Sequence, residues 1–526
     1  MSTVPDVSVV IPVYNTMPYL TACLDSMVAQ TIGAGRVEVI AVDDGSTDGS
    51  GAELDRFAAE HPDLVRVVHQ ANSGGPAVPC NAGLELARGR YVFFIGSDDY
   101  FGPEALERMV GRADELGSDV LLGKMVGVNG RKAPGVFEED VADAPFPTPE
   151  LAWALSNTKL FRRELVEAEG LRFPEGMAVC SDVPFTLRAM AKASKITILS
   201  DYDCYYAVKR ETGGNLIYST GPVEWVHAAE RIVAAIESLY GPGPEREALM
   251  YRVFSREIAK CVQPEFLAAD APEREKFWDA VAGFCDAHLT EAIRAQLPTE
   301  KRVKVSLAQA REWRLLEAVI REDAPGFLVE DGRVFVRYAG FREGRPDEWY
   351  EATAERVVGR LVKGIDPVDL AWAGDRAAGF FLEYWFRVPV AGLEPEAVGV
   401  SAERLVRAKG PAARRSVPVA EFHPHDVAAE VELRPDGDTT VVAARLPLAE
   451  VAAAPGRWSL RGHLRMGPFV YDVPLTAVKG PVERQGRPGS VTVDWGPKSH
   501  LVVHSAGRPS LKRRVANLVG LKPSRK

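Results

Sequence analysis

The first hundred residues alternate between continuous apolar runs and segments whose apolar positions recur every three or four residues. Continuous apolar runs at 7–14 and 37–46 are typical of strands buried in a sheet, the first of them on both faces, and 64–70 and 91–100 are predicted to be the third and fourth strands. The segments 19–30, 49–60 and 81–89 between them are predicted helices, and in the first of these one helical face carries Leu20, Cys23, Leu24, Met27 and Val28. Strand–helix alternation of this kind predicts an α/β fold with a parallel sheet and right-handed crossovers.

The pattern changes in the second half of the chain. Residues 221–325 contain amphipathic helical segments, and 327–336 predicts a β-hairpin with Asp331 and Gly332 in its turn. From about residue 366 the apolar period becomes two, as in 457–466, which predicts an immunoglobulin-like β-sandwich. We therefore expect an α/β domain at 1–220, a helical extension and linker at 221–345, a sandwich at 346–506 and a basic tail at 507–526.

Composition narrows the class of protein. The chain has 526 residues, and its net charge of −10 argues against non-specific nucleic-acid binding. No apolar run approaches the length of a membrane span, and the first residues lack the pattern of a signal peptide, so we expect a cytoplasmic enzyme. Six scattered cysteines form no CxxC pair, which disfavours a zinc site or a disulfide framework. The basic tail is either disordered or a helix that rests on the inner face of an anionic membrane.

Polar residues gather where the predicted parallel strands end, at the edge where such sheets bind ligands. That edge carries Tyr14, two pairs of adjacent aspartates and the glycine-rich loop 72–76, which is not a GxGxxG dinucleotide fingerprint. The pair Asp43 and Asp44 is equally compatible with an ordinary turn before a helix cap.

The second aspartate pair, Asp98 and Asp99, is harder to explain by local structure. The next helix is predicted to start at Gly102 and Pro103, so capping leaves both carboxylates without a role. Hard oxygen ligands crowded at a strand end suit Mg²⁺ or Mn²⁺, which keeps open positions for substrate phosphates. We therefore expect the pair to hold a divalent metal.

Several motifs together carry a resemblance to a known family. VSVVIPVYN, VDDGSTD, NSGGP, GSDDY and SDVPF occur in the order found in inverting family 2 glycosyltransferases of the GT-A fold. Further segments at 118–131, 156–165 and 209–215 resemble the enzymes that add N-acetylglucosamine to poly(ribitol phosphate) wall teichoic acid, the TarS type. The strong part of the resemblance covers about residues 5–215, and beyond it the likeness is architectural.

The resemblance implies a UDP-sugar donor, a Mn²⁺ or Mg²⁺ cofactor and an anionic acceptor polymer. It assigns Asp182 as the catalytic base, Asp98 and Asp99 as the metal ligands, and the following positions to the donor: Pro12, Tyr14, Asp44, Asn72, Asp98, Arg131 and Arg210. Asp182 precedes a helical run, so a role as helix cap is the alternative. In the resembling enzymes the C-terminal domains drive trimerisation, and carbohydrate binding is the competing interpretation of the sandwich.

The chain also departs from the family pattern. Gly96 stands where many relatives have a third aspartate, Ser181 stands where an acid usually precedes the base, and Cys80 replaces an arginine after the glycine-rich loop. The function expected is transfer of a sugar, N-acetylglucosamine foremost, to an anionic cell-wall polymer such as teichoic acid. The alternatives are the same fold acting on an exopolysaccharide or lipid-linked glycan, and a catalytically inactive sugar-binding scaffold.

Overall fold

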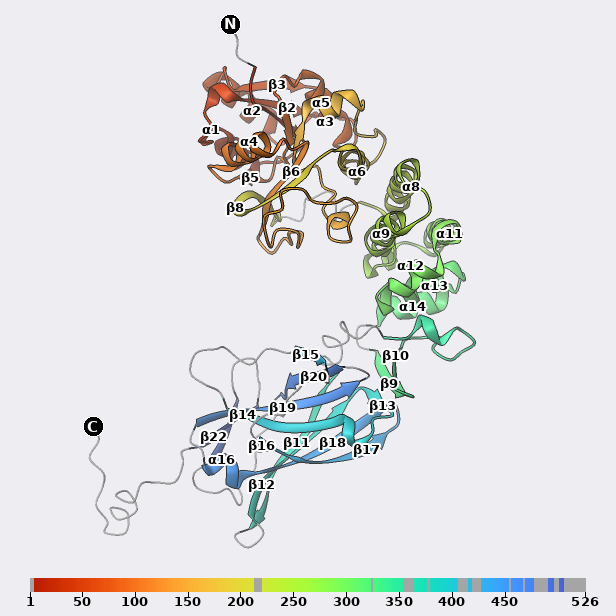
Figure 1. Ribbon diagram of the computed structural model, residues 1–526. Coiled ribbons are helices and arrows are strands. Elements are labelled where there is room, and N and C mark those ends of the chain that lie inside the picture. The colour runs from red at the N-terminus through yellow and green to blue at the C-terminus, as the bar shows by residue number, and fades with distance from the viewer. Residues whose placement is uncertain are drawn as a thin grey trace, which may run out of the picture. The chain divides into compact units, whose positions relative to one another are not determined.

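The structure is a computed structural model that describes residues 4–211, 220–322, 325–352, 364–375, 379–404, 415–418, 427–453, 456–466, 469–476, 491–495 and 501–505 (Figure 1). Within it the chain forms two compact units. The first contains residues up to Leu297 together with Ala308–Arg311, and the second contains Pro298–Leu307 and everything from Glu312 onwards.

The first unit is built on an eight-stranded sheet in the order β3-β2-β1-β4-β7-β6-β8-β5. Four parallel strands come from the first hundred residues, as predicted: β1 (Val7–Val13), β2 (Val37–Asp43), β3 (Val65–His69) and β4 (Tyr91–Phe94). The sheet then becomes mixed, because the short β7 (Leu160–Arg162) is antiparallel to both β4 and β6 (Val120–Val128). The last strands are β8 (Ile196–Val208), parallel to β6, and β5 (Tyr100–Phe101), antiparallel to β8.

Helices enclose this sheet and complete its core. They are α1 (Tyr19–Val28), α2 (Ser50–Glu60), α3 (Ala77–Leu86), α4 (Ala105–Leu116), α5 (Arg163–Ala168) and α6 (Asp182–Lys192). The predicted apolar face of α1 is confirmed for Leu20, Cys23, Leu24 and Met27, which join β1, β2 and α4 in one buried cluster, whereas Val28 is exposed. Burial of both faces of β1 and β2 explains why their sequences are continuous apolar runs.

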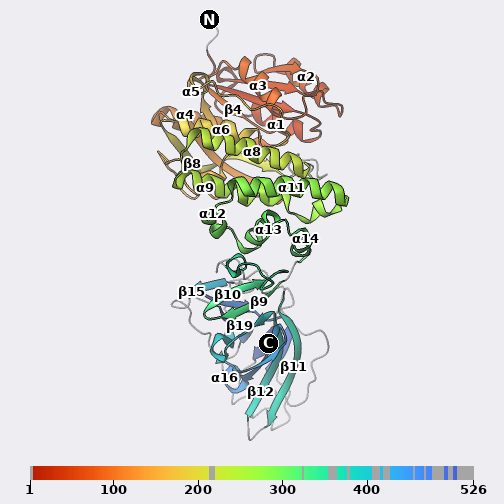
Figure 2. The same ribbon diagram turned by 90° about the vertical axis from the view of Figure 1, so that its right-hand side faces the viewer.

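A helical extension follows and packs on the first unit. It begins with α8 (Pro222–Leu239), α9 (Pro244–Val253), a π-helical turn (Phe254–Ile258), α10 (Ala259–Cys261) and α11 (Ala271–His288). Figure 2 shows α8, α9 and α11 side by side, and α8 also packs against α6, the helix that starts with Asp182. The short helix α12 (Glu291–Gln296) ends this part, so the predicted helical region contributes directly to the first unit.

The second unit starts with α13 (Thr299–Gln309, whose last two residues belong to the first unit), α14 (Trp313–Arg321) and the predicted hairpin. The hairpin consists of β9 (Gly326–Glu330) and β10 (Arg333–Arg337), and its turn residues Asp331 and Gly332 have φ of 48° and 73°. Such a pair of positive φ angles is typical of a type I′ turn. The strand β13 (Val390–Ala391) adds to β9 in parallel.

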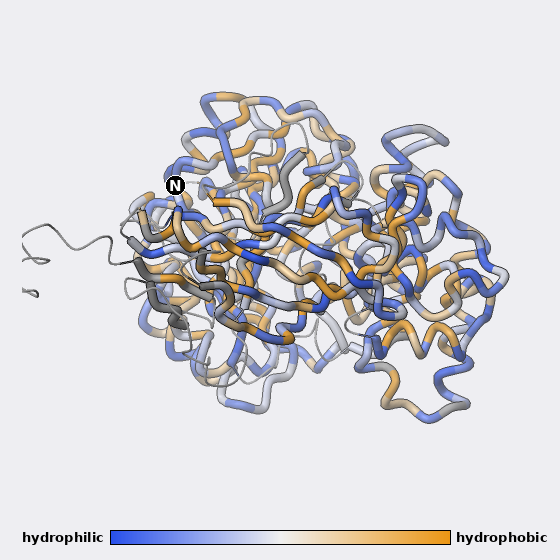
Figure 3. Tube along the Cα trace, turned by 90° about the horizontal axis from the view of Figure 1, so that it is seen from below, coloured by the Kyte–Doolittle hydropathy of each residue, from blue (hydrophilic) through white to orange (hydrophobic). Residues whose placement is uncertain are grey.

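Two antiparallel sheets make up the rest of the second unit, in agreement with a sandwich. One has the order β11-β12-β18-β17, with strands Asp366–Asp375, Gly379–Val388, Thr439–Pro447 and Glu430–Asp436. The other sheet contains β14 (Val398–Arg404), β15 (Arg415–Pro418), β16 (Val427–Ala428), β19 (Gly456–Met466), β20 (Phe469–Pro474), β21 (Val491–Trp495) and β22 (Leu501–Ser505). A short helix, α16 (Leu448–Ala453), follows β18 in the chain. In Figure 3 hydrophobic and hydrophilic positions alternate along these strands.

Strand β19 is buried on both faces, whereas alternation of apolar and polar residues is typical of a strand with one solvent-exposed face. Its apolar set is buried as predicted for Trp458, Leu460 and Leu464, but the intervening Arg461 and His463 are buried too. Arg461 donates from Nε to Oδ1 of Asp472 at 2.5 Å, and both side chains are essentially inaccessible to solvent. A buried guanidinium therefore has a buried carboxylate partner, as burial of charge requires.

Three expectations remain predictions after this description. The boundaries at 220 and 345 and the immunoglobulin-like topology of the sandwich are not decided by the sheets described, and the basic tail 507–526 lies outside the described residues. Within the described part of the chain, none of the helices combines the length and the apolar character that crossing a membrane requires.

Candidate active site

Two adjoining cavities open at the carboxyl edge of the parallel strands. The first, about 290 Å³, is lined by Pro12, Tyr14, Asp44 and Asn72 together with the 74–76 loop. The second, about 360 Å³, is lined by residues that include Asp98, Asp99, Arg131, Asp182 and Arg256. Pro12, Pro76 and Arg210 line both, so the two cavities adjoin at these residues.

The first cavity has a fixed carboxylate at its floor. Asp44 is buried, and its two oxygens accept hydrogen bonds from Gln70 Nε2 at 2.6 Å and from the Ser73 backbone N–H at 3.0 Å and hydroxyl at 2.9 Å. The neighbouring Gly45 has φ 77°, and a Cβ there would lie 2.8 Å from the Asn72 backbone nitrogen. Glycine is thus required for the loop to close over Asp44.

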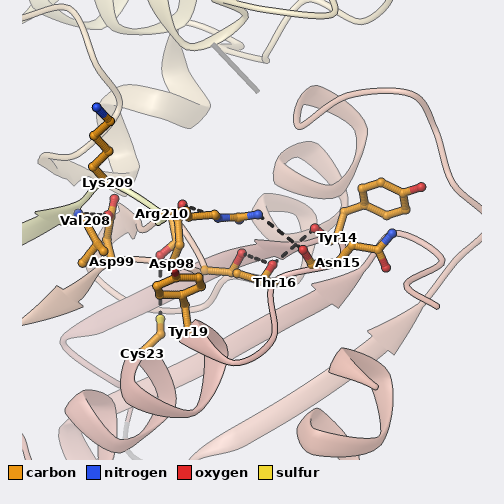
Figure 4. Close-up of polar contacts among 12 residues, drawn as sticks. Tyr14, Asn15, Thr16, Tyr19, Cys23, Asp98, Asp99, Val208, Lys209 and Arg210 are labelled. Carbon is orange, nitrogen blue, oxygen red and sulfur yellow. Dashed lines mark hydrogen bonds and ion pairs between the residues drawn. The ribbon is translucent and has the colours of Figure 1, made fainter. Parts of the chain in front are cut away.

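Asp98 lies between the cavities and is paired with an arginine from the end of the domain (Figure 4). Its Oδ2 accepts from Arg210 Nε at 2.8 Å, and both side chains are largely buried, with exposed fractions of 12% and 15%. Arg210 also donates from Nη1 to the Asn15 carbonyl at 3.3 Å, so it links the β1–α1 turn to the aspartate pair. The negative charge of Asp98 is therefore balanced by an arginine that lies far away in the sequence but next to it in space.

Asp99 is held more deeply and by different groups. Its Oδ2 accepts from the Tyr205 hydroxyl at 2.5 Å and its Oδ1 from the Val208 N–H at 2.7 Å, while Arg131 Nη1 lies 3.9 Å from Oδ1. Burial and the charge of Asp98 raise the pKa of Asp99 to about 7, against the opposing effect of Arg131. The Asp99 carboxyl thus anchors the end of β8 to the β4–β5 loop.

Both aspartates line the cavity in which a divalent cation would lie, and the oxygens of each already have partners of a different kind. Asp98 presents a carboxylate to the second cavity, and one or two carboxylates completed by substrate phosphates and water are the usual protein contribution to a Mg²⁺ or Mn²⁺ site. Both Asp99 oxygens are already engaged by Tyr205 and Val208. Among the described residues no group of three or more His, Cys, Asp or Glu side chains could hold a metal, so the donor phosphates would have to supply the remaining ligands.

Asp182 occupies the first position of α6 and lines the second cavity. The helix cap is the preceding Ser181, whose side chain makes no capping bond, so the capping alternative for Asp182 does not match the structure. Burial raises the pKa of Asp182, whereas the charges of Arg256, Arg252 and Lys159 lower it. A carboxyl that is poised in this way at a cavity suits a general base.

Three cations around Asp182 escaped the sequence analysis. Arg252 and Arg256 come from α9 and the π-helical turn of the helical extension, and Lys159 precedes β7. Arg252 is buried and donates from Nη1 to Glu257 Oε2 at 2.8 Å. A conspicuous signal in the sequence was lacking, because amphipathic helices carry many arginines on their solvated faces.

All the residues predicted for the donor, the metal and the base line one or both cavities, although they come from segments as far apart in the sequence as Pro12 and Arg210. The structure thereby brings them together, and their chemical roles stay predictions. Cys80 also lines the second cavity and is buried, and a Cβ on Gly96 would lie 2.9 Å from Asp99 Oδ2. Tyr205, Gln70 and Ser73, whose side chains hold the site aspartates, were not among the predicted site residues.

Comparisons with known proteins give the family of the chain. Residues 8–167 match the family described as glycosyl transferase family 2, and residues 222–320 match the glycosyl transferase TarS linker domain. The chain is 38% identical to a poly(ribitol-phosphate) beta-glucosyltransferase of Bacillus spizizenii over 63% of this chain and 53% of the relative. It therefore spans about half the length of that relative. It is also 30% identical to the glycosyltransferase GlyG of Streptococcus pneumoniae, over 49% of this chain and 80% of that protein.

Solved structures show the same likeness. A crystal structure of Staphylococcus aureus TarS 1–349 in complex with UDP-GlcNAc superposes with a TM-score of 0.56 at 29% identity, over 66% of this chain and 99% of that one. The full TarS crystal structure matches in fold over 97% of this chain and 86% of that one, with a TM-score of 0.59 and 21% identity. The predicted resemblance is confirmed: the chain belongs to glycosyl transferase family 2 and carries a linker of the TarS type.

Proposed function

We propose that this protein transfers a sugar from a UDP-sugar to a hydroxyl of an anionic cell-wall polymer of the poly(ribitol-phosphate) class. The observation that carries the proposal is the convergence of Asp44, Asp98, Arg210 and Asp182 on two adjoining cavities at the carboxyl edge of the sheet. Family membership and the activities named for the similar proteins support it.

In this proposal the uridine lies in the first cavity, against Pro12 and Tyr14 and next to the carboxylate of Asp44. The diphosphate lies beside Arg210, which lines both cavities, and the sugar lies in the second cavity near Asp182. The acceptor hydroxyl attacks the anomeric carbon from the face opposite the diphosphate. Asp182 takes the hydroxyl proton as the new C–O bond forms and the bond to the diphosphate breaks, so the configuration inverts.

The Asp98 carboxylate would hold Mn²⁺ or Mg²⁺ together with the diphosphate, and Asp99 would hold the β4–β5 loop in place. Such a cation supplies Lewis-acid stabilisation of charge on the leaving diphosphate. Arg210 and Arg131 supply further positive charge on the same side of the cavity.

Two sugars are candidates for the group that is transferred. N-acetylglucosamine is the sugar expected from the resemblance, and the TarS structure was solved with UDP-GlcNAc. Glucose is favoured by the higher identity, 38%, to a protein named as a beta-glucosyltransferase. An assay of the purified chain with Mn²⁺, a ribitol-phosphate oligomer and either UDP-glucose or UDP-GlcNAc decides between them by UDP release and product mass.

The same assay tests the reaction class. Turnover of one of the donors on a ribitol-phosphate oligomer supports the proposal, and turnover only on a neutral glycan or lipid-linked acceptor would assign a different substrate. If neither donor is consumed with any acceptor while UDP still binds, the protein is a sugar-nucleotide-binding scaffold. A homotrimer formed by the C-terminal unit, a cytoplasmic location and membrane contact through residues 507–526 are further parts of the proposal.

A further inference from the structure

Lys159 follows three residues that line the second cavity, is buried, and has no ion-pair partner among the residues that the structure describes. Lys159 is 2% exposed, and its Nζ donates to the Ser156 carbonyl at 2.6 Å. Ser156, Asn157 and Thr158, which precede it, line the cavity together with Asp182. A neutral carbonyl orients an ammonium group but leaves its charge uncompensated, and an uncompensated buried charge is costly.

The other charges around Asp182 are already engaged. Arg252, on α9, is paired with Glu257, and Arg256 Nε lies 3.9 Å from Glu257 Oε1 on the same π-helical turn. The remaining titratable groups that face Asp182 are the thiols of Cys80, on α3, and Cys180, and burial raises the pKa of both. Lys159 is thus the cation near Asp182 whose charge no carboxylate in the described residues takes up by direct contact.

We propose that Lys159 is a positioning residue for proton transfer, whose buried ammonium group keeps Asp182 in its carboxylate form until the acceptor hydroxyl gives up its proton. The inference rests on the proposed role of Asp182 as base. Charges interact strongly through a poorly solvated interior, so the effect does not need direct contact. Burial lowers the pKa of Lys159 to about 7, so its ammonium form prevails on the acid side of that value, and the charge of Asp182 opposes the shift.

The test is the pH dependence of kcat/KM for transfer by the full chain. Lys159→Gln keeps a donor for the Ser156 carbonyl and removes the charge. The acid limb of its profile should move up by about one pH unit, so activity below the limb falls about tenfold and returns towards the wild-type value at alkaline pH. Lys159→Arg should keep the wild-type limb.

Lys192→Met is the matched control, because Lys192 lies at the other end of α6, is half-exposed and approaches Glu169 at 3.6 Å. Thermal unfolding at each pH checks that the variants are folded, and Lys159→Met replaces the glutamine variant if that one does not fold. An unchanged acid limb, or an equal loss of activity at every pH, overturns the proposal for Lys159. Full activity of Asp182→Asn overturns the proposed base itself, so the two failures are distinguishable.

Discussion

At the scale of single residues, the site is organised by an ion pair and a hydrogen bond that the chain assembles from distant segments. Asp98 meets Arg210 and Asp99 meets Tyr205, and the partners in each pair are more than a hundred residues apart. Two adjacent carboxylates in a sequence repel each other and need stabilising partners, but the sequence does not show whether the partner is a metal, an arginine or a tyrosine. Sequence therefore predicted the aspartates and Arg210, but neither the pairing of Arg210 with Asp98 nor the contact of Tyr205 with Asp99.

The unequal surroundings of the two aspartates give a first prediction. Asp98→Asn should abolish metal-stimulated transfer and weaken Mn²⁺ binding in the presence of UDP. Asp99→Asn should keep Mn²⁺ binding within a fewfold but lower the melting temperature, because it disturbs the bonds to Tyr205 and Val208. Calorimetric titration of Mn²⁺ with UDP and thermal unfolding measure both. Equal loss of Mn²⁺ binding in the two variants would show that both are metal ligands.

Gly96 gives a second prediction. Many members of the resembling family have an aspartate here, but in this chain a Cβ at this position would lie 2.9 Å from Asp99 Oδ2 and 3.1 Å from Asp98 Oδ1. Gly96→Ala should therefore destabilise the fold by about 1–3 kcal/mol, and Gly96→Asp should destabilise it more. Gly111→Ala is the control: nothing lies within 4 Å of a Cβ at this α4 residue, so it should gain about 0.4–1 kcal/mol. Chemical denaturation compares them, and a neutral Gly96→Ala would contradict the packing argument.

At the scale of secondary structure, a histidine joins two strands and a helix of the first unit. His69, on β3, approaches Asp43 of β2 through Nδ1 at 2.9 Å and Asp55 of α2 through Nε2 at 3.0 Å. The hydrogen bonds to Asp43 and then to Asp55 raise the pKa of His69 above its usual value. The charged imidazole is therefore favoured by the folded state.

This arrangement makes stability depend on pH. The contribution of His69 is fully present below about pH 6.5, its pKa in an unfolded chain, and is lost as the pH rises through the higher folded value. The melting temperature of wild type should exceed that of His69→Gln at pH 6, and the difference should shrink at pH 8 to 9. Thermal unfolding across this range is the measurement. A difference that stays constant or grows with pH would contradict the assignment.

The elements themselves were predictable to differing degrees. β1, β2 and the helices α1 and α2 follow from long apolar runs and helical periodicity, because the strands are buried on both faces and each helix has one buried face. β3 lies at the edge of the sheet, and only its Val65 is buried. The antiparallel β7 has three residues and β5 has two, too few for any periodicity to appear. In β19 apolar and polar residues alternate as predicted, but the burial of Arg461 and His463 depends on tertiary packing, which cannot be predicted from this alternation.

At the scale of the whole molecule, the helical extension is part of the active site and not only a connector. Arg256, in the extension, lines the second cavity, and α8 packs on α6. A chain ending at residue 220 should therefore lose transfer even if it still binds UDP, whereas the site as proposed is complete in a chain ending after residue 352. UDP titration and transfer assays on both truncated chains test this, and normal transfer by the shorter one would contradict it.

The end point at residue 352 lies just beyond the boundary near 345 expected from sequence, which stays a prediction. Tyr350 is fully buried, and Arg302 donates to the Trp349 carbonyl at 3.0 Å, so a cut at 345 would open packed structure in the second unit. If the sandwich is an oligomerisation module, the chain ending after 352 should sediment as a monomer and the full chain as a larger species. Two monomers would instead favour a binding role for the sandwich.

The ion pair between Asp98 and Arg210 has a consequence for the order in which ligands reach the site. Before ligands bind, the charges of the pair cancel. A cation that binds alone is then repelled by the Arg210 guanidinium, and a diphosphate that binds alone is repelled by the Asp98 carboxylate. When both ligands bind, the cation pairs with Asp98 and the diphosphate pairs with Arg210, so the two new pairs replace the ion pair between these residues. Nucleotide and metal should therefore bind with positive cooperativity, and because such linkage is reciprocal, each should tighten the other by the same factor.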